Sequence, residues 1–364
     1  MGLQGRRWRW GWMTDGVACL SRPVSGTGSS DLLTDLLRDV SRSFYLTLWL
    51  LPGAIRRPIG LGYLLARATD TIADTELVPV TERLEALDRV RRRIRGEAGE
   101  ALDLSRLAGA QQAGASPAER ILLERIEEGI SVLEGLAAED RERVRWVLEV
   151  IAGGQQLDLQ RFVGAGEAKV VALPDAAALE DYTYRVAGCV GEFWTRMCRA
   201  RLFPRVKLDE AKLMADGVRF GQGLQLVNIL RDLPRDLKQG RCYLPLDELA
   251  AVGLRPEELR DPSKEGRLAP VYGRWLKRAE AHLAAGWDYT TTLPRGELRL
   301  RMACAVPVLL GIRTLEKLKG GGVLDPTRRI KVGRSEVRGV LWRCAVRLVW
   351  PRWWDGLAEW ARRG

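Results

Sequence analysis

Two groups of acidic side chains, spaced four residues apart, are the residues of this sequence best suited to carry out chemistry. Asp70 and Asp74 form the first group, within the largely apolar run GYLLARATDTIAD. On a helix, residues four apart share one face, with Cβ atoms roughly 6 Å apart. Two carboxylates at that distance repel each other, and a bound cation removes the repulsion. Hard oxygen ligands on a rigid helix suit Mg²⁺, which takes its remaining ligands from water and from a substrate's phosphates.

The second group is longer and has an amide at its start. Asn228, Asp232 and Asp236 recur at four-residue intervals among leucine, isoleucine and valine, which predicts a buried helix with a stripe of oxygen ligands. Pro234 lies inside this stripe and lacks a backbone N–H, so we expect it to kink or loosen the helix there. One such pair in a charged helical protein is usually a solvated face. Two groups in apolar helices, each beside an arginine, favour metal binding.

Composition excludes several other classes of site. The six cysteines are scattered without a CxxC pair and the chain has one histidine, which argues against a zinc site, a disulfide scaffold and a Ser-His-Asp triad. The net charge is +11, but much of the excess lies at the two ends of the chain. Because the middle has no compact basic run with interleaved aromatics, we expect no nucleic-acid partner. The cysteine usage is typical of a reduced, cytoplasmic protein.

The elements that must hold these residues are predicted to be helices. Strand signals are nearly absent, no GxGxxG pattern occurs, and no run is apolar enough to cross a membrane. The absence of a clear linker favours one all-α domain at 31–335, after a disordered extension at 1–30. The Trp- and Arg-rich segment 336–364 is predicted to be an amphipathic helix that makes peripheral membrane contact or, alternatively, covers a cavity. The expected helices are 31–50, 54–75, 80–97, 117–135, 138–164, 176–202, 207–238, 266–289, 298–318 and 334–350.

Four motifs occur in an order and spacing that resemble the squalene/phytoene synthase family, over about residues 35–320. They are Ser41-Arg42-Ser43-Phe44-Tyr45, Arg67–Asp74, Tyr184–Gly188, and Gln225–Asp236 followed by GRCYLP. The resemblance implies a single isoprenoid-synthase helical domain around a central cavity, with the two aspartate motifs facing each other across it. It also implies Mg²⁺ as a cofactor and a prenyl diphosphate as the substrate.

The same resemblance implies a role for each matching residue. The metal-binding positions would be Asp70, Asp74, Asn228, Asp232 and Asp236. The substrate-binding positions would be Ser41, Arg42, Ser43, Phe44, Arg67, Gln225 and Arg231. Arg67 and Arg231 would also act in catalysis by neutralising the diphosphate, and Tyr184 would serve the cyclopropanation step. Two positions depart from many relatives, since Ala73 and Arg235 stand where an acidic residue is common, which leaves the number of metal ions open.

The reaction implied most directly is that of bacterial family members that join two farnesyl diphosphates head to head and reduce the product to squalene with NADPH. The basic segment with Arg329, Lys331 and Arg334 resembles the region that holds the NADPH phosphate, and Arg and Lys suit a 2′-phosphate. Two alternatives stay open: a synthase that stops at presqualene diphosphate, or one that makes phytoene without NADPH. A helical assembly factor without activity is a third, although all four motif aspartates are present.

Overall fold

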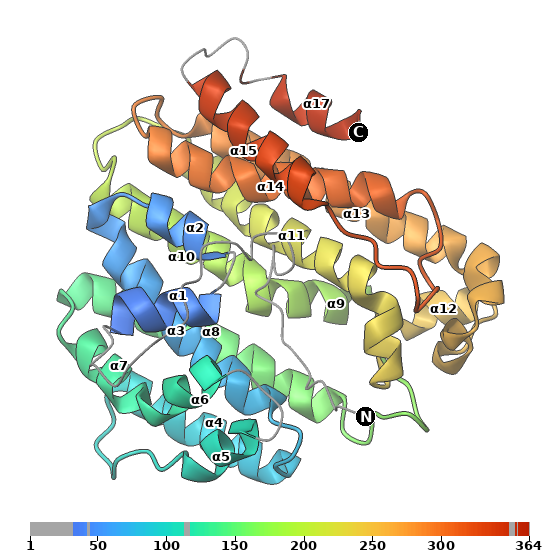
Figure 1. Ribbon diagram of the computed structural model, residues 1–364, viewed down its shortest axis with the longest axis horizontal. Helices are drawn as coiled ribbons and strands as arrows, with labels where there is room; N and C mark the ends of the chain where they lie inside the picture. Colours follow the sequence, from blue (N-terminus) through green and yellow to red (C-terminus); the bar gives the residue numbers. More distant parts are fainter. Residues whose placement is uncertain (1–31, 42–43, 113–116, 349–353, 355, 364) are drawn as a thin grey trace. The chain divides into compact units, whose positions relative to one another are not determined.

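The computed structural model describes residues 32–41, 44–112, 117–348, 354 and 356–363 (Figure 1). The predicted extension at 1–30 lies outside the described residues. Nearly all regular structure is helical, which confirms the all-α prediction. Backbone contacts divide the chain into two compact units. One unit comprises Met1–Leu159 with Arg196–Pro204, and the other comprises Gln160–Thr195 with Arg205–Gly364.

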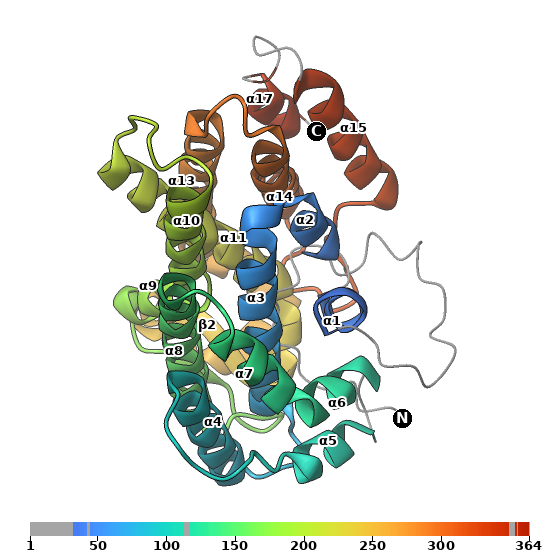
Figure 2. The same ribbon diagram turned by 90° about the vertical axis from the view of Figure 1, so that its left-hand side faces the viewer.

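The first unit is organised around α3, which carries the first acidic motif. Helices α1, α2, α4, α6 and α7 all contact α3 (Figure 2). Most residues of α3 are buried. Small residues allow this packing, since a Cβ at Gly60 would already lie 3.1 Å from Leu37. The elements of this unit are η1 (Leu32–Leu36), α1 (Leu37–Ser41), α2 (Phe44–Leu50), α3 (Gly53–Asp74), α4 (Val80–Arg95), α5 (Ser105–Gln112), α6 (Pro117–Glu124), α7 (Ile126–Glu134) and most of α8 (Ala138–Arg161).

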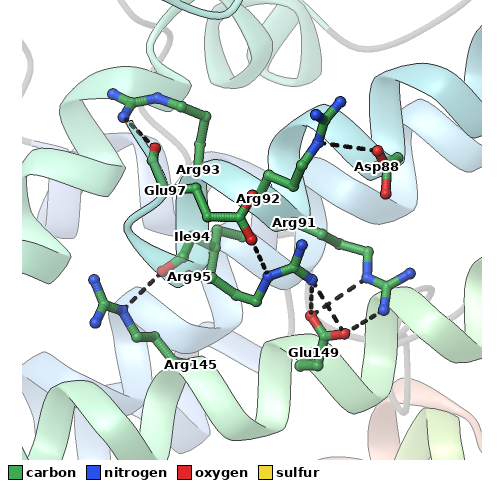
Figure 3. A network of polar contacts seen from close by, with 9 residues as sticks. All are labelled: Asp88, Arg91, Arg92, Arg93, Ile94, Arg95, Glu97, Arg145 and Glu149. Carbon is green, nitrogen blue, oxygen red and sulfur yellow. Dashed lines mark hydrogen bonds and ion pairs between the residues drawn. The ribbon is translucent and has the colours of Figure 1, made fainter. Parts of the chain in front are cut away.

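A network of charged side chains joins the end of α4 to α8 (Figure 3). Arg91 and Arg95 both pair with Glu149, the second at 3.3 Å. Arg145 of α8 donates from Nε to the carbonyl oxygen of Ile94 at 2.8 Å, which satisfies one of the carbonyls left without a partner at the end of α4. Exposed pairs of this kind contribute only tenths of a kcal/mol each, so the network orients α4 more than it stabilises the fold.

The second unit is organised around α11, which carries the second acidic motif. Helices α13 and α14, the turn η2 and strand β2 all contact α11. Figure 1 shows α13 and α14 beside α11. The elements of this unit are β1 (Val171–Leu173), α9 (Ala176–Thr183), η2 (Tyr184–Gly188), the first part of α10 (Cys189–Arg201), α11 (Glu210–Lys238), β2 (Arg241–Pro245), α12 (Leu246–Ala251), η3 (Pro256–Arg260), η4 (Pro262–Lys264), α13 (Glu265–Thr292), α14 (Leu298–Leu318), α15 (Arg334–Leu348) and α17 (Leu357–Arg362).

Glycines bring η2 and the start of α10 into backbone contact with α11. A Cβ at Gly191 would lie 1.8 Å from the carbonyl oxygen of Gly217, and a Cβ at Gly221 would lie 2.1 Å from that of Ala187. Both distances are far below van der Waals contact, so no residue with a side chain fits there without moving a backbone. The identity of these glycines therefore sets how closely the π-helical turn η2 approaches the metal-motif helix.

Several elements differ from those predicted. The helix expected at 176–202 is interrupted by η2, the one expected at 31–50 is in pieces, and the helices at 105–112 and 246–251 were not predicted. Two short parallel strands also form, with Val171 paired to Arg241. Gly240, at φ 76°, precedes the second strand, and a Cβ there would lie 2.1 Å from the backbone nitrogen of Gly166. Strands this short form because tertiary contacts pair them, which local patterns do not record.

The C-terminal part packs against α13 and α14 through two of its tryptophans. Trp354 is 2% exposed and stacks on Trp287 with ring centroids 5.8 Å apart. The ring of Trp360 lies 4.1 Å from the guanidinium of Arg313. Trp342 of α15, in contrast, is 64% exposed. Within the described ranges, no helix combines the length and the apolarity that a membrane crossing requires.

Candidate active site

Arg67, Asp70 and Asp74 lie in the last two turns of α3, as the sequence predicts. Arg67 donates from Nη1 to Asp70 Oδ2 at 2.5 Å and from Nη2 to Glu119 Oε1 of α6 at 2.5 Å. The arginine thus bridges two buried carboxylates. Glu119 was not predicted as a site residue. It lies 52 positions from Arg67 in the chain, and its own segment PAERILLE has no pattern that indicates such a partner.

Burial dominates the electrostatics of this motif. It raises the pKa of the Asp70 carboxyl well above its usual range; Arg67 opposes this, and the neighbouring Asp74 and Glu119 add to it. Burial alone would lower the pKa of Arg67, but Asp70 and Glu119 more than offset that effect. Asp70 Oδ1 is buried and has no hydrogen-bond partner among the described residues. Binding of a cation next to Asp70 would therefore be especially favourable, because it would offset the cost of burying the charged carboxylate and give Oδ1 a partner.

Glu119→Gln tests the bridge through Arg67. The substitution keeps the size of the side chain but removes one of the two charges that compensate a buried guanidinium. We expect the free energy of unfolding to fall by about 1–2 kcal/mol in a denaturant titration. Glu124→Gln on the same helix is the matched control, because Glu124 is exposed and pairs with Arg120 only at 3.5 Å. We expect it to change stability by less than about 0.5 kcal/mol. Equal effects of the two substitutions would contradict the bridge.

The second motif has the helical stripe that its spacing predicts. Gln225 and Asn228 of α11 are buried, and Asp232 and Asp236 are partly exposed. Arg231 holds Asp232 with two hydrogen bonds, from Nε to Oδ1 at 3.0 Å and from Nη2 to Oδ2 at 2.9 Å. This two-point contact fixes the plane of the carboxylate. The stripe therefore runs from an apolar environment toward solvent along a single helix.

Tyr184 begins η2, the π-helical turn that packs on α11. Its hydroxyl donates to Glu192 Oε2 at 2.9 Å. A proton relayed by Tyr184 therefore has Glu192 as its immediate neighbour, which the sequence alone did not indicate. Two residues earlier, the buried Tyr182 stacks on Tyr243 of β2, with ring centroids 4.6 Å apart. This stack fixes the strand of the GRCYLP motif against α9.

The donor sets of the two motifs fit Mg²⁺. Both offer carboxylate or amide oxygens from rigid, buried helices, and Asp70 has an oxygen without a partner in the described part of the chain. Within that same part, no three His, Cys, Asp or Glu side chains gather into a metal-binding cluster. An ion at either motif would therefore draw further ligands from water or substrate phosphates, as Mg²⁺ usually does. The positions concerned are Asp70 and Asp74, and Asn228, Asp232 and Asp236.

Of the predicted substrate-binding residues near the start of the fold, the structure describes the side chain of Ser41 only. Ser41 ends α1 and is buried, with its hydroxyl donating to the carbonyl oxygen of Leu37 at 2.5 Å. Phe44 begins α2, but its side chain lies outside the described part, as do Arg42 and Ser43. The substrate-binding roles of these four residues stay predictions.

The basic segment between α14 and α15 presents three cations to solvent. Arg329, Lys331 and Arg334 are exposed, and none has an ion-pair partner among the described residues. The backbone of the segment is nevertheless held in place. Lys317 Nζ donates to the carbonyl oxygen of Lys331 at 3.1 Å, and the Gly333 N–H donates to a carboxylate oxygen of α15 at 2.7 Å. The segment therefore has a backbone held by hydrogen bonds and three exposed cations without an ion-pair partner among the described residues.

Comparison with known proteins identifies the family of this chain. The family model described as squalene/phytoene synthase matches residues 37–336. The chain belongs to the squalene/phytoene synthase family. It is 28% identical over 342 residues to the presqualene diphosphate synthase of Zymomonas mobilis, across 92% of this chain and 99% of that relative.

Solved structures show the same fold. The complex of TcSQS with the ligand E5700 superposes with a TM-score of 0.69 and 20% identity, covering 91% of this chain and 96% of that one. Squalene synthase HpnC from Alicyclobacillus acidocaldarius gives a TM-score of 0.56 and 19% identity, covering 79% and 92%. As a squalene/phytoene synthase, the chain is a transferase of isoprenoid biosynthesis that acts on prenyl diphosphates.

Proposed function

We propose that this squalene/phytoene synthase joins two molecules of farnesyl diphosphate head to head, with Mg²⁺, to form presqualene diphosphate. The observation that carries the proposal is the oxygen stripe of α11, in which Arg231 fixes Asp232 beside a buried Asn228. The likeness to a relative named presqualene diphosphate synthase, over nearly the full length of both chains, supports the same choice.

In this proposal the side chains stabilise a leaving diphosphate. Mg²⁺ supplies the positive charge that lets the allylic C–O bond break, with the electron pair leaving on the diphosphate. Arg67 and Arg231, each beside its own acidic motif, donate hydrogen bonds to diphosphate oxygens as negative charge develops on them. The double bond of the second prenyl chain then attacks the carbocation. Loss of a proton closes the cyclopropane, and Tyr184 with Glu192 beside it accepts that proton. Apolar residues pack around α11 and help to keep water from the cation.

Reduction to squalene is the second candidate function, and one observation favours it. The three free cations of Arg329, Lys331 and Arg334 suit the 2′-phosphate of NADPH. In this version the three cations would hold NADPH, which would supply the hydride that reduces presqualene diphosphate when its diphosphate is lost. Replacing all three cations by serine would then abolish squalene formation while presqualene diphosphate still accumulates.

A product assay tests both functions. Purified protein is incubated with Mg²⁺ and either farnesyl or geranylgeranyl diphosphate, with and without NADPH, and the lipids are extracted. Presqualene diphosphate under both conditions supports the first function, and squalene formed only with NADPH supports the second. Phytoene from geranylgeranyl diphosphate in place of either would change the assigned substrate. No turnover of either prenyl diphosphate would contradict the proposal and leave the non-catalytic assembly factor as the explanation.

We also propose that the protein works in the cytoplasm, in peripheral contact with the inner face of the membrane through α15. Arg334, Arg338 and Trp342 follow at four-residue intervals, and all three are exposed. An aromatic ring beside arginines suits an anionic lipid surface. Co-sedimentation with phosphatidylserine-containing vesicles should weaken in Trp342→Ala. It should not change in Trp49→Ala, a control at another tryptophan that is 54% exposed. Equal loss in both variants, or equal binding to neutral vesicles, would contradict this contact.

A further inference from the structure

The helix that carries the second acidic motif contains a proline that ought to weaken it. Pro234 has no N–H, so the carbonyl oxygen of Leu230, four residues earlier, loses its helical hydrogen bond. The sequence therefore predicted a kinked or loosened turn at this point. In the structure α11 stays helical past Pro234 as far as Lys238. The turn that loses the bond is the one that carries Asp232.

A tyrosine from the neighbouring helix replaces the missing donor. Tyr272 of α13 donates its hydroxyl to the carbonyl oxygen of Leu230 at 3.0 Å, and both residues are buried. Burial also raises the pKa of Tyr272, so its hydroxyl keeps its proton as a donor throughout the physiological range. A carbonyl buried without a partner is unfavourable, and this contact removes that cost at the one position where the proline creates it.

We propose that Tyr272 is a positioning residue for the second acidic motif: its hydroxyl substitutes for the N–H absent at Pro234 and holds the turn that presents Asp232 and Asp236. The inference rests on the proposed function, because it assigns these carboxylates to Mg²⁺-diphosphate binding. Tyr272 lies on α13 and contacts the backbone of α11. It therefore orients the turn that carries the carboxylates and is not itself a metal ligand. Pro234 and Tyr272 form a matched pair, because the proline removes a donor to the Leu230 carbonyl and the tyrosine supplies one.

A double-mutant cycle tests the pair. Tyr272→Phe leaves the Leu230 carbonyl without a donor, and we expect the unfolding temperature to fall by roughly 3–6 °C. In a Pro234→Ala background the new alanine N–H satisfies the same carbonyl, so the added Tyr272→Phe should shift the unfolding temperature by less than half as much. Non-additive shifts of this kind are expected when two residues serve the same hydrogen-bond partner. Additive shifts would overturn the contact as the reason for the effect.

Binding of Mg²⁺ with inorganic pyrophosphate, followed by calorimetry, tests the positioning role. We expect Tyr272→Phe to weaken this binding about 5- to 10-fold, equivalent to roughly 1–1.4 kcal/mol, and the double variant to recover most of the loss. Tyr289→Phe is the matched control, because Tyr289 is a buried tyrosine of the same helix whose hydroxyl accepts from Thr195 at 3.2 Å. It should lower the unfolding temperature without weakening binding.

Pyrophosphate binding by the wild-type protein and by Tyr272→Phe distinguishes a failure of the positioning role from a failure of the proposed function. Unchanged pyrophosphate binding in Tyr272→Phe, with a wild-type protein that binds normally, would overturn the positioning role alone. A wild-type protein that binds no Mg²⁺-pyrophosphate would overturn the proposed function and the positioning role with it. The thermal cycle tests the Tyr272–Leu230 contact in either case.

Discussion

Asp232→Asn lowers Mg²⁺-dependent release of pyrophosphate from farnesyl diphosphate by roughly 10²–10³-fold, the usual loss when one fixed electrostatic group is removed from an active site. The substitution keeps the size of the side chain but removes its negative charge. It also deprives Arg231 of a bidentate anion partner, so both a metal ligand and the orientation of the guanidinium change. Asp70→Asn in α3 should have an effect of similar size, because its carboxylate is buried beside Arg67.

The measurement is a pyrophosphate-release assay at saturating Mg²⁺, with circular dichroism to confirm that the helices are retained. Asp288→Asn is the control, since Asp288 lies exposed on α13 and only approaches Lys212 at 4.0 Å. It should keep wild-type rates. Release near the wild-type rate in Asp232→Asn would contradict a metal-binding role for the α11 stripe.

Gly221→Ala should be the most destabilising single methyl that can be added to α11 near η2. Its Cβ would lie 2.1 Å from the carbonyl oxygen of Ala187, a backbone atom that cannot rotate away. The helix and the turn must therefore separate, at a cost of about 3 kcal/mol or more. We expect a fall in unfolding temperature of roughly 5–10 °C. Because Tyr184 begins the displaced turn, the rate of product formation should fall as well.

Gly273→Ala provides the comparison for this experiment. Gly273 lies within α13, and a Cβ there meets no atom within 4 Å. Alanine is the better helix former, so this variant should gain about 0.5–1 kcal/mol. If Gly221→Ala were as stable as Gly273→Ala, the close approach of η2 to α11 would be wrong, and with it the placement of Tyr184.

Long apolar helices were predictable from the sequence, and contacts between distant segments were not. The helices with the acidic motifs were expected at 54–75 and 207–238, and they span Gly53–Asp74 and Glu210–Lys238. Both carry a hydrophobic pattern over many turns, which is the strongest local signal in a sequence. The π-helical break at η2 depends instead on backbone contact between glycines of two helices, which local patterns do not contain.

In the candidate site, too, residues in local motifs were predictable and residues contributed by distant segments were not. The acidic residues and Arg231 were identifiable because their spacing is itself the signal. Glu119 and Tyr272 were not, because each reaches the site from another helix and belongs to no local motif. Pro234 shows the consequence most clearly. Read alone it predicts a loosened helix, whereas the structure keeps the helix with a donor supplied 42 positions away.

The most direct test of metal binding at both motifs is a crystal structure with Mn²⁺ and a farnesyl thiodiphosphate that does not ionise. Mn²⁺ prefers the same oxygen ligands as Mg²⁺ and can be located by its anomalous scattering. We predict anomalous peaks within coordination distance of Asp70 or Asp74, and of Asp232 or Asp236, each also in contact with the analogue's phosphates. Peaks at neither motif, with both carboxylate groups free of metal while the analogue is bound, would contradict the account.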